Sequence, residues 1–459
     1  MTADFDFNTT HELGNIIDLI SDKISADEVD ENTYISTDNM IVDRGGVEKA
    51  SKLPAASKFN HFQVGDTLFS NIRTYFRKVW HASFEGGASP DVLIFRSKDK
   101  KNVLPTFLYY LLSNKHFVDY TDQTSKGAKM PRGDKTAITQ YRAYIPSPNV
   151  QRKIGDHLKA LDDKIEINNQ INRTLEEMAQ AIFKSWFVDF EPTKAKIKVL
   201  EAGGTEDEAE RAAMTAISGK DSAALDAMAA DQPEAYAKLQ ATAALFPAAL
   251  ADSELGPIPE GWTTEAVINS AEFINGAAYK NMHFSSDPDA KPVIKIAELK
   301  SGITGNTKFT NTDLGDKFKL DTGDILFSWS GSPETSIDTF IWVGGEAWLN
   351  QHIFKVVNSE PAQRNSTFWL LKHLKPVFIA IAKNKQTTGL GHVTRKDMEK
   401  LKYCVPSEEI QALFCSVTAP YLDNIESNLV EQETLKSLRD TLLPKLLSGE
   451  IDLEGLADD

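Results

Sequence analysis

Residues 161–196 read LDDKIEINNQINRTLEEMAQAIFKSWFVDFEPTKAK. Apolar residues recur in this stretch at alternating spacings of three and four, and charged residues fill most positions between them. That period is typical of an amphipathic α-helix with one buried stripe. The stripe runs into the aromatic residues Trp186, Phe187 and Phe190, and Pro192 then favours an end to the helix. The sequence therefore predicts a long helix that closes in an aromatic cluster.

The chain repeats itself around this helix. Residues 144–147 (YIPS) recur as residues 404–407 (CVPS), and about forty following residues keep the same offset of 260 without a gap. Matching positions include Ile165 and Ile425, Leu175 and Leu435, and, ahead of the helices, residues 65–70 (GDTLFS) and residues 323–328 (GDILFS). Internal repeats of this kind indicate a duplicated architecture. The predicted order is module, helix, linker, module, helix.

Both helical copies carry a heptad seam that is apolar at its ends and polar in its middle. The seam positions are Leu158, Leu161, Ile165, Asn168, Asn172, Leu175, Ala179, Ile182 and Trp186 in the first copy, and Thr418, Tyr421, Ile425, Asn428, Gln432, Leu435, Arg439 and Leu442 in the second. Polar seam residues weaken a coiled coil but fix its register. We therefore expect an antiparallel pair whose register is set by Asn168, Asn172, Asn428 and Gln432. In that pair Asn172 and Gln432 meet near the midpoint; the alternative is two unrelated helices, each docked on its own module.

The remaining segments read as two mixed α/β modules and a linker. Residues 91–96 (DVLIFR) and 352–357 (HIFKVV) have the apolar content of short buried strands, and a helical pattern follows each. Residues 197–255 are rich in Ala, Glu and Asp, which favours a solvated helical linker. The predicted fold class is α+β. Its parts are a first module at 1–147, a spacer helix at 148–192, an acidic helical linker at 193–256, a second module at 257–406, and a second spacer helix with a C-terminal tail at 407–459.

Length and composition bound the class of protein. A chain of 459 residues exceeds one ordinary core, so two or three domains are expected. Charged residues at 25% and hydrophobic residues at 41% describe a soluble globular protein. No apolar run is long enough to span a bilayer, and the acidic start differs from a signal peptide, so we expect a cytoplasmic protein. Cys404 and Cys415 show no metal-ligand spacing, which favours two reduced, mostly buried thiols.

The charge is distributed unevenly. A net charge of −16 disfavours nucleic acid as a partner, because phosphate binding requires Lys and Arg. Residues 51–150, however, hold 15 Lys and Arg against 7 Asp and Glu, whereas residues 201–260 hold 3 against 12. The first 50 residues are also acidic, with 3 against 12. One basic module therefore stands in an acidic chain.

Motifs of catalytic sites are missing from the sequence. It contains neither a Gly-x4-Gly-Lys-Ser/Thr phosphate loop nor the Asn/Asp-Pro-Pro-aromatic tetrapeptide of amino-methyltransferases. Asp91 with Asp99 and Lys101 fits a loose nuclease pattern, but Asp99 lies in a polar run that is more typical of a turn. His352 and His392 have no partner at ligand spacing, so we expect structural histidines.

Two glycine-containing loops at matching places carry side chains of the kind that read DNA. Residues 124–135 read TSKGAKMPRGDK, and residues 384–396 read NKQTTGLGHVTRK. Lys and Arg can neutralise phosphates or read guanine, Asn and Gln can pair with adenine, and glycine lets the backbone approach a groove. A charged loop is usually only a solvated loop, but two at matching places favour DNA contact. The candidate DNA-binding residues are Arg73, Arg77, Lys126, Lys129, Arg132, Lys135, Lys385, Gln386, Thr387, Thr388, Arg395 and Lys396.

In these features the chain resembles the specificity (S) subunit of type I restriction-modification enzymes. Residues 161–196 are similar to the central conserved region of that family, residues 252–262 (DSELGPIPEGW) to the entry into its second recognition domain, and residues 443–453 (LPKLLSGEIDL) to its C-terminal ending. The resemblance covers nearly the whole chain and is strongest in the helices. It implies two target-recognition domains, each reading one half of a bipartite, asymmetric DNA site. About 40 helical residues at a rise of 1.5 Å would hold them roughly 60 Å apart.

The resemblance also implies partners and cofactors. A non-catalytic chain would dock with two modification subunits that bind S-adenosylmethionine and methylate adenine, and with restriction subunits that use ATP and Mg²⁺. We expect Trp186, Phe187 and Phe190 to cap the helix pair or to meet the modification subunit; filling the local core is the alternative. The second helix has no copy of this cluster, so its contacts need not match. A coiled-coil adaptor that does not bind DNA and an enzyme with its own active site are the other function classes.

Overall fold

The computed structural model describes residues 5–127, 130–386, 389–451 and 453, and it divides into two compact units. The first unit combines residues 1–166 with 434–459, and the second comprises residues 167–433. The boundary crosses both long helices, α5 (Pro148–Phe187) and α15 (Glu408–Ser448). Each unit therefore contains one module together with a part of each helix.

The first unit contains two four-stranded sheets and a strand pair. The first sheet has the order β2 (Ile17–Leu19), β9 (Val92–Ser97), β6 (Thr67–Ser70), β7 (Val79–His81). The second has the order β3 (Lys23–Ser25), β5 (Lys58–Phe62), β8 (Gly86–Ala88), β4 (Tyr34–Ile35). The pair is β1 (Thr9–Glu12) with β10 (Arg142–Ile145), and the helices are α1 (Leu13–Ile16), α2 (Pro105–Ser113), α3 (Lys115–Gln123) and α4 (Lys135–Gln140), with 3-10 turns η1 (Ala26–Glu28) and η2 (Thr74–Phe76).

The second unit contains the corresponding elements. Its first sheet has the order β14 (Glu272–Asn275), β22 (Ile353–Val357), β18 (Ile325–Ser328), β20 (Asp338–Ile341), and its second β16 (Phe309–Thr310), β15 (Lys291–Ile294), β21 (Ala347–Leu349), β17 (Lys319–Leu320). The strand pairs are β13 (Thr263–Ala266) with β24 (Lys402–Val405), β19 (Ser330–Gly331) with β23 (Gly391–His392), and β11 (Leu250–Ala251) with β12 (Ile258–Pro259). The helices are α10 (Ile296–Ser301), α11 (Pro333–Ser336), α12 (Pro361–His373), α13 (Lys375–Asn384) and α14 (Arg395–Lys400).

The two modules repeat each other strand by strand. The first sheets match completely, and the second sheets share three strands, with β4 parallel to β8 as β15 is parallel to β21. The fourth strand differs, because β3 extends the sheet beside β5 whereas β16 extends it beside β15. The predicted strands at 91–96 and 352–357 are confirmed as β9 and β22, and α2 and α12 follow them. The duplication predicted from the sequence is confirmed, with one edge of the second sheet as the exception.

The repeated Gly-Asp motif has a structural reason. Asp66 accepts hydrogen bonds from Arg96 Nε at 2.7 Å and Nη2 at 2.6 Å, and Asp324 accepts one from Lys355 Nζ at 2.8 Å. Each aspartate thus ties the turn before β6 or β18 to the neighbouring strand. A charge-assisted hydrogen bond of this kind fixes the strand register in both modules.

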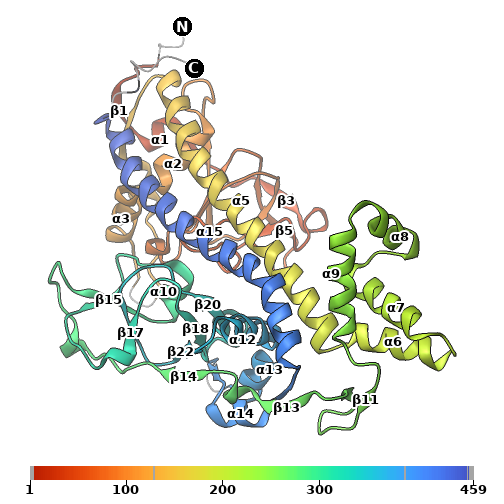
Figure 1. Ribbon diagram of the computed structural model, residues 1–459. Coiled ribbons are helices and arrows are strands. Elements are labelled where there is room, and N and C mark those ends of the chain that lie inside the picture. The colour runs from red at the N-terminus through yellow and green to blue at the C-terminus, as the bar shows by residue number, and fades with distance from the viewer. Residues whose placement is uncertain (1–4, 128–129, 387–388, 452, 454–459) are drawn as a thin grey trace. The chain divides into compact units, whose positions relative to one another are not determined.

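The two spacer helices are 40 and 41 residues long, and they pack antiparallel within each unit (Figure 1). In the second unit, Asn428 Nδ2 donates to Asn172 Oδ1 at 2.8 Å and Gln432 Nε2 donates to Asn169 Oδ1 at 3.0 Å. Asn168 Nδ2 donates to Glu431 Oε2 at 2.7 Å. In the first unit, Arg439 forms an ion pair with Asp162.

All four polar seam residues bond across the helix pair, but their partners differ from those expected from the sequence. Asn172 meets Asn428 rather than Gln432, so the expected Asn172–Gln432 contact was wrong. With the offset of 260, the observed pairs place the midpoint of the helix pair at residues 170 and 430. The heptad pattern alone predicts this midpoint two positions later, at residues 172 and 432. The physical reason is that Asn169 and Glu431, which lie beside the seam, also take part in the pairing.

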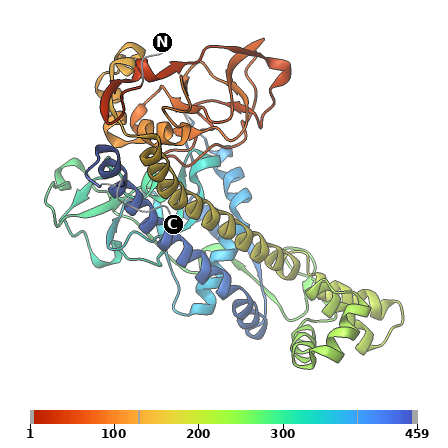
Figure 2. The same cartoon turned by 90° about the horizontal axis from the view of Figure 1, so that it is seen from above.

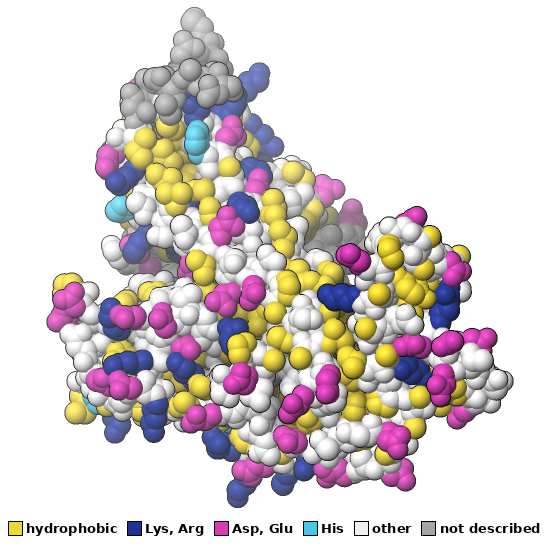
Figure 3. Space-filling model, viewed as in Figure 1, with side chains coloured by type: hydrophobic (Ala, Val, Ile, Leu, Met, Phe, Trp, Pro, Cys, Tyr) yellow, Lys and Arg dark blue, Asp and Glu magenta, His cyan; other side chains and the backbone are white. Residues whose placement is uncertain are grey.

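The acidic linker is a helical subdomain. Its helices are α6 (Glu191–Glu201), α7 (Glu206–Ser218), α8 (Ser222–Asp231) and α9 (Pro233–Ala244), drawn in green in Figures 1 and 2. Ala213, Met214, Leu225 and Ala243 form a small core of their own between these helices. Carboxylate side chains are scattered over its surface among apolar side chains in Figure 3. The predicted helical content is confirmed, although the segment is more compact than a solvated connector. Among the described residues, no helix is long and apolar enough to cross a membrane.

Candidate nucleic-acid interface

In the first unit, two loops join to form one surface at the end of the first sheet. One loop follows β6, and the other is described at residues 126–127 and 130–134. Arg73 N donates to Pro131 O at 3.1 Å, and Gly133 N donates to Asn71 O at 3.2 Å. Ile72 and Arg132 form an isolated antiparallel bridge. These backbone bonds make the two loops a single structural element.

The first of these loops has an unusual backbone. Arg73 at φ 50° and Arg77 at φ 49° flank the 3-10 turn η2, and both lie in the left-handed region. Side chains other than glycine rarely adopt that conformation, so it persists only where the surroundings enforce it. Between these arginines, Tyr75 and Phe76 are exposed, and their ring centroids lie 4.7 Å apart. The loop therefore presents an aromatic pair to solvent.

The second unit builds the same surface from the matching segments. β19 follows β18 and pairs antiparallel with β23, where Ser330 faces His392. Val393 N donates to Trp329 O at 2.8 Å. Ser330 and His392 are the counterparts of Ile72 and Arg132 in the sequence repeat. In each module, the loop after the third strand of the first sheet (β6 or β18) is thus bonded to the loop before a short helix (α4 or α14).

Most of the predicted basic residues of the first unit lie on this surface. Arg73, Lys126, Arg132 and Lys135 are exposed. Arg132 forms an ion pair with Asp91 at 2.9 Å, and Lys126 forms one with Asp134, whose pKa is lowered by that hydrogen bond. Lys129 lies outside the described residues.

Arg77 does not belong to this set. It is half-buried and forms ion pairs with Asp43 at 3.0 Å and Asp440 at 3.2 Å, and Nη2 donates to Ser113 O at 3.3 Å. Three internal acceptors hold the guanidinium of Arg77, and the DNA contact predicted for it stays a prediction. Sequence spacing gave no sign of this, since Asp440 lies 363 residues away.

The residues predicted to bind DNA in the second unit also divide into exposed side chains and side chains held by internal partners. Lys396 is exposed, and Gln386 is exposed with Nε2 donating to Gly389 O at 2.7 Å. Arg395 is also exposed, and its Nη1 donates a hydrogen bond to Phe273 O at 2.8 Å. Lys385 is held by Asp397 at 2.5 Å, which makes it a loop-stabilising residue in the free chain. Thr387 and Thr388 lie outside the described residues.

Sequence reasoning missed four residues of these surfaces. Tyr75 and Phe76 are the exposed aromatic pair of the first unit, and Trp329 and His392 occupy the matching loops of the second. The sequence repeat could have identified His392, because His392 matches Arg132 at the offset of 260. No comparable signal marks the aromatic residues, since their exposure depends on the turn between the two left-handed arginines.

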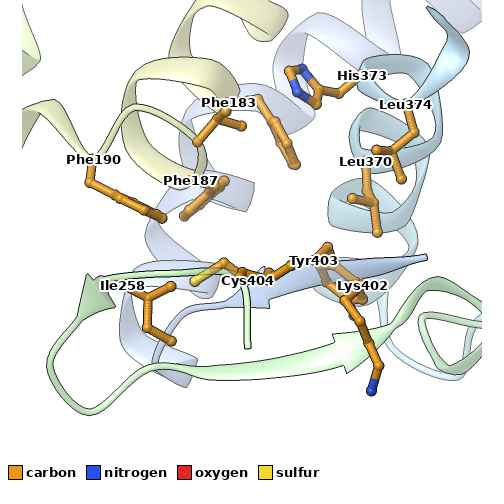
Figure 4. Close-up of a pocket in the computed structure, with 12 residues that line it drawn as sticks. Phe183, Phe187, Phe190, Ile258, Leu370, His373, Leu374, Lys402, Tyr403 and Cys404 are labelled. Atoms are coloured by element: carbon orange, nitrogen blue, oxygen red, sulfur yellow. The ribbon is translucent and has the colours of Figure 1, made fainter. Parts of the chain in front are cut away.

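The aromatic end of α5 is part of the core of the second unit. Trp186, Phe187 and Phe190 are buried, and Phe187 lies 5.0 Å from Phe414 and 6.0 Å from Trp262 between ring centroids. Phe414 belongs to α15, so the cluster caps the helix pair, which was one of its two expected roles, and it also fills the local core. Because the three side chains are buried, their burial gives no support to the other expected role, docking of the modification subunit. Phe187 and Phe190 also line an apolar cavity of about 240 Å³ with Phe183, Leu370, His373 and Cys404 (Figure 4). Burial raises the pKa of the Cys404 thiol to about 12, which fits the expected inert cysteine.

The second helix replaces this aromatic cluster with aliphatic residues. At the offset of 260, Phe183, Trp186 and Phe187 correspond to Leu443, Leu446 and Leu447, which are buried in the core of the first unit. The two helix ends therefore play equivalent roles, although their side chains differ. The sequence analysis recognised the missing aromatic residues but not their replacement.

The residues considered for catalysis have structural roles. Asp99 accepts a hydrogen bond from Lys101 N at 2.8 Å, which confirms the expected turn. Asp91 binds Arg132 in the loop surface. Within residues 5–127, 130–386, 389–451 and 453, no group of three or more His, Cys, Asp or Glu side chains lies close enough to hold a metal ion.

Comparison with known families decides the class of this duplicated chain. Residues 11–177 and 259–436 each match the type I restriction modification DNA specificity domain. The chain belongs to this family. The two matches fall on the two modules with their spacer helices, so this specificity protein recognises DNA, and the coiled-coil adaptor is set aside.

Known relatives of this specificity protein cover its length. The chain is 27% identical over 460 residues to the type I restriction enzyme HindI specificity subunit of Haemophilus influenzae, with 96% of this chain and 99% of that protein covered. It is 24% identical over 364 residues to the MjaIX specificity subunit of Methanocaldococcus jannaschii, with 78% and 71% covered. Among solved structures, the type I restriction-modification S subunit from M. genitalium is similar over 97% of this chain and 98% of that chain, with 13% identity and a TM-score of 0.47.

Proposed function

We propose that this specificity protein directs a type I restriction-modification complex to an asymmetric, bipartite DNA site. Each recognition domain reads one half of that site through its joined loops. The observation that carries the proposal is the repeated loop surface, with Ile72 bridged to Arg132 in one module and Ser330 paired with His392 in the other. Equivalent surfaces with different side chains are what two different half-sites require.

The side chains of these surfaces support a division between positioning and reading. Arg73, Lys135 and Lys396 are exposed cations that contact phosphates, which sets the orientation but not the sequence. Arg132 and Lys126 are bound to carboxylates in the free chain, so on DNA they exchange a carboxylate partner for a phosphate or a base edge. Tyr75 and Phe76 supply apolar contact, for example with a thymine methyl group. Binding is then salt-dependent, and its selectivity comes from the loops.

The chemistry of the complex belongs to its partners. In this proposal two modification subunits bind S-adenosylmethionine and methylate one adenine in each half-site. Restriction subunits use ATP and Mg²⁺ to act on unmodified DNA. The specificity chain contributes no reacting group, and it determines where both activities are directed.

The modification subunits dock on the spacer helices. The buried aromatic end of α5 is not accessible for this purpose, but Ile167, Ile171 and Met178 of the same helix are 49%, 42% and 45% exposed. Their spacing of four and seven residues places them on one face of α5. Val430 of α15 is exposed as well. Apolar side chains arranged in this way on a surface helix mark a protein interface.

One experiment tests the proposed function. The chain is co-expressed with a modification subunit from the same genome, the complex is purified, and the methylation of the host DNA is sequenced. We expect a bipartite motif with one methylated adenine in each half and a fixed gap between the halves. Co-purification without any methylated motif, or a continuous motif without a gap, would contradict the proposal.

A further inference from the structure

Four strained residues of the first recognition domain lie in two adjoining segments. Asp43 at φ 51° and Arg44 at φ 62° share the left-handed conformation of Arg73 and Arg77. Asp43 N donates to Phe76 O at 2.9 Å, and Arg44 N donates to Arg77 O at 3.0 Å. The turn that presents Tyr75 and Phe76 is thus bonded to a second strained turn behind it.

Both turns direct an arginine at one carboxylate of the spacer. Arg44 forms an ion pair with Asp440 of α15, and Arg77 reaches the other oxygen of the same carboxylate at 3.2 Å. The side chain of Arg44 is 0% exposed, and its Nε and Nη1 have no hydrogen-bond partner among the described residues. Asp440 is therefore the group that neutralises a buried cation at the base of the recognition loop.

Asp440 is itself fixed by the spacer. Burial acts to raise its pKa, but the charges of Arg44, Arg77 and Arg439 lower it to about 2. Arg439 Nε lies 3.3 Å from Asp440 Oδ1, and its Nη1 binds Asp162 of α5. The carboxylate thus stays ionised and joins the recognition loop to both spacer helices within the first unit.

The second recognition domain differs at the position that matches this carboxylate. At the offset of 260, Asp440 corresponds to Gln180, a neutral side chain whose Nε2 donates to Trp369 O at 3.1 Å. Its loop after β18 has a left-handed glycine, Gly331, where the first domain uses strained arginines. At this position of the repeat, the spacer therefore has a charged partner for the recognition loop in the first domain and a neutral side chain in the second.

We propose that Asp440 is a positioning residue for DNA reading, which holds the loop of residues 71–77 in its strained conformation. This inference rests on the proposed function and assigns to the spacer a role beyond setting a distance. Without the carboxylate, Arg44 and Arg77 repel each other, and the left-handed residues lose the contact that enforces their conformation. The aromatic pair and Arg73 then lose their fixed place against the first half-site, while the second half-site is read as before.

The test uses the purified complex with its modification subunit. Asp440→Asn removes the charge and keeps the shape, and Asp440→Glu restores the charge. Glu426→Gln is the matched control, because Glu426 lies on the same helix and pairs with Arg364 at 3.3 Å in the second unit. The half-site of the first domain is identified beforehand as the half that stays unchanged when residues 263–400 are exchanged for those of a relative.

Two measurements are made on each variant. The first is the methylation rate of duplexes with single-base changes in either half-site. The second, made without DNA, is amide hydrogen exchange at residues 43–44 and 73–77. For Asp440→Asn we expect discrimination at the first half-site to fall about tenfold, the size of one weakened base contact, with faster exchange in both segments. Asp440→Glu should recover most of both effects, and Glu426→Gln should change neither.

Several outcomes would overturn the inference. Unchanged discrimination by Asp440→Asn would show that the loop reads DNA without its anchor. Equal losses in both half-sites would indicate a general loss of stability, and unchanged hydrogen exchange would show that the carboxylate does not hold the loop. A wild-type complex without sequence-specific methylation would instead contradict the proposed function, and the exchange measurement would still decide the role of Asp440.

Discussion

At the residue scale, Trp186 shows how the spacer is anchored in the second unit. Its side chain is 4% exposed, and its ring contacts Phe246 at 5.2 Å and Phe414 at 6.1 Å between centroids. These partners belong to the end of the acidic insert and to α15, so one tryptophan joins three segments of the chain.

Replacement of Trp186 tests this core role. Trp186→Ala should lower the free energy of unfolding by about 3–5 kcal/mol, because it removes a large buried side chain and leaves a cavity. Denaturant unfolding followed by fluorescence and circular dichroism measures the change. Val188→Ala, at an exposed neighbour, should cost less than about 0.5 kcal/mol. If Trp186→Ala keeps its stability but no longer binds a modification subunit, the docking role would replace the core role.

The Arg439–Asp162 pair gives a second prediction at this scale. Arg439→Met should destabilise the first unit by about 2–4 kcal/mol, because it leaves the partly buried Asp162 without its cation. Adding Asp162→Asn should return at least half of that loss, since the neutral amide still accepts the hydrogen bond that Tyr110 donates at 2.9 Å. A double-mutant cycle by chemical denaturation measures the coupling. Additive losses would mean that the pair contributes no coupling energy.

At the element scale, the exposed stripe of α5 predicts the docking site. Ile167→Glu combined with Ile171→Glu places two charges on an apolar face without disturbing the buried seam. We expect the double variant to fold normally and to bind the modification subunit at least about tenfold more weakly, as desolvated interface positions require. Affinity is measured by pull-down titration. Met282→Glu, an apolar-to-charged change at an 83% exposed position elsewhere, is the control. Full binding by the double variant would place the docking site elsewhere.

The length of the helices gives a second prediction at this scale. Duplicating residues 167–173 together with 427–433 adds one heptad to each helix at matching positions, and it keeps the seam period and the exposed residues Ile167 and Ile171. Seven residues at 1.5 Å lengthen the pair by about 10 Å, the length of about three base pairs. We expect a methylated motif with a gap longer by up to about three base pairs and unchanged half-sites. An unchanged gap would exclude the ruler role.

The elements were predicted better than their contacts. Heptad spacing and the offset of 260 predict both long helices, and apolar runs predict β9 and β22, because these signals are local. The register of the helix pair shifted by two positions, since Asn169 and Glu431 join the pairing from beside the seam. The internal role of Arg77 could not be predicted, because its partner Asp440 is distant in sequence and becomes its neighbour only through the fold.

At the scale of the whole molecule, duplication separates the reading of the two half-sites. Each unit has its own sheets, its own loop surface and its own hydrophobic core, and the described contacts that shape each loop surface lie within one unit. The family match likewise covers each module separately. The acidic insert of α6 to α9 stands outside this repeat, because it lies between the two segments that match the family.

Exchange of one module is the decisive prediction at this scale. Replacing residues 263–400, from β13 to the end of α14, with those of a relative should change one half of the methylated motif and leave the other half and the gap intact. Trp262 is retained, because it packs against Phe187 and Phe190 of the spacer. The matched exchange of residues 13–140 should change the opposite half. Methylation sequencing of both hybrids reads the outcome, and a change in both halves by either hybrid would show that the modules do not read DNA independently.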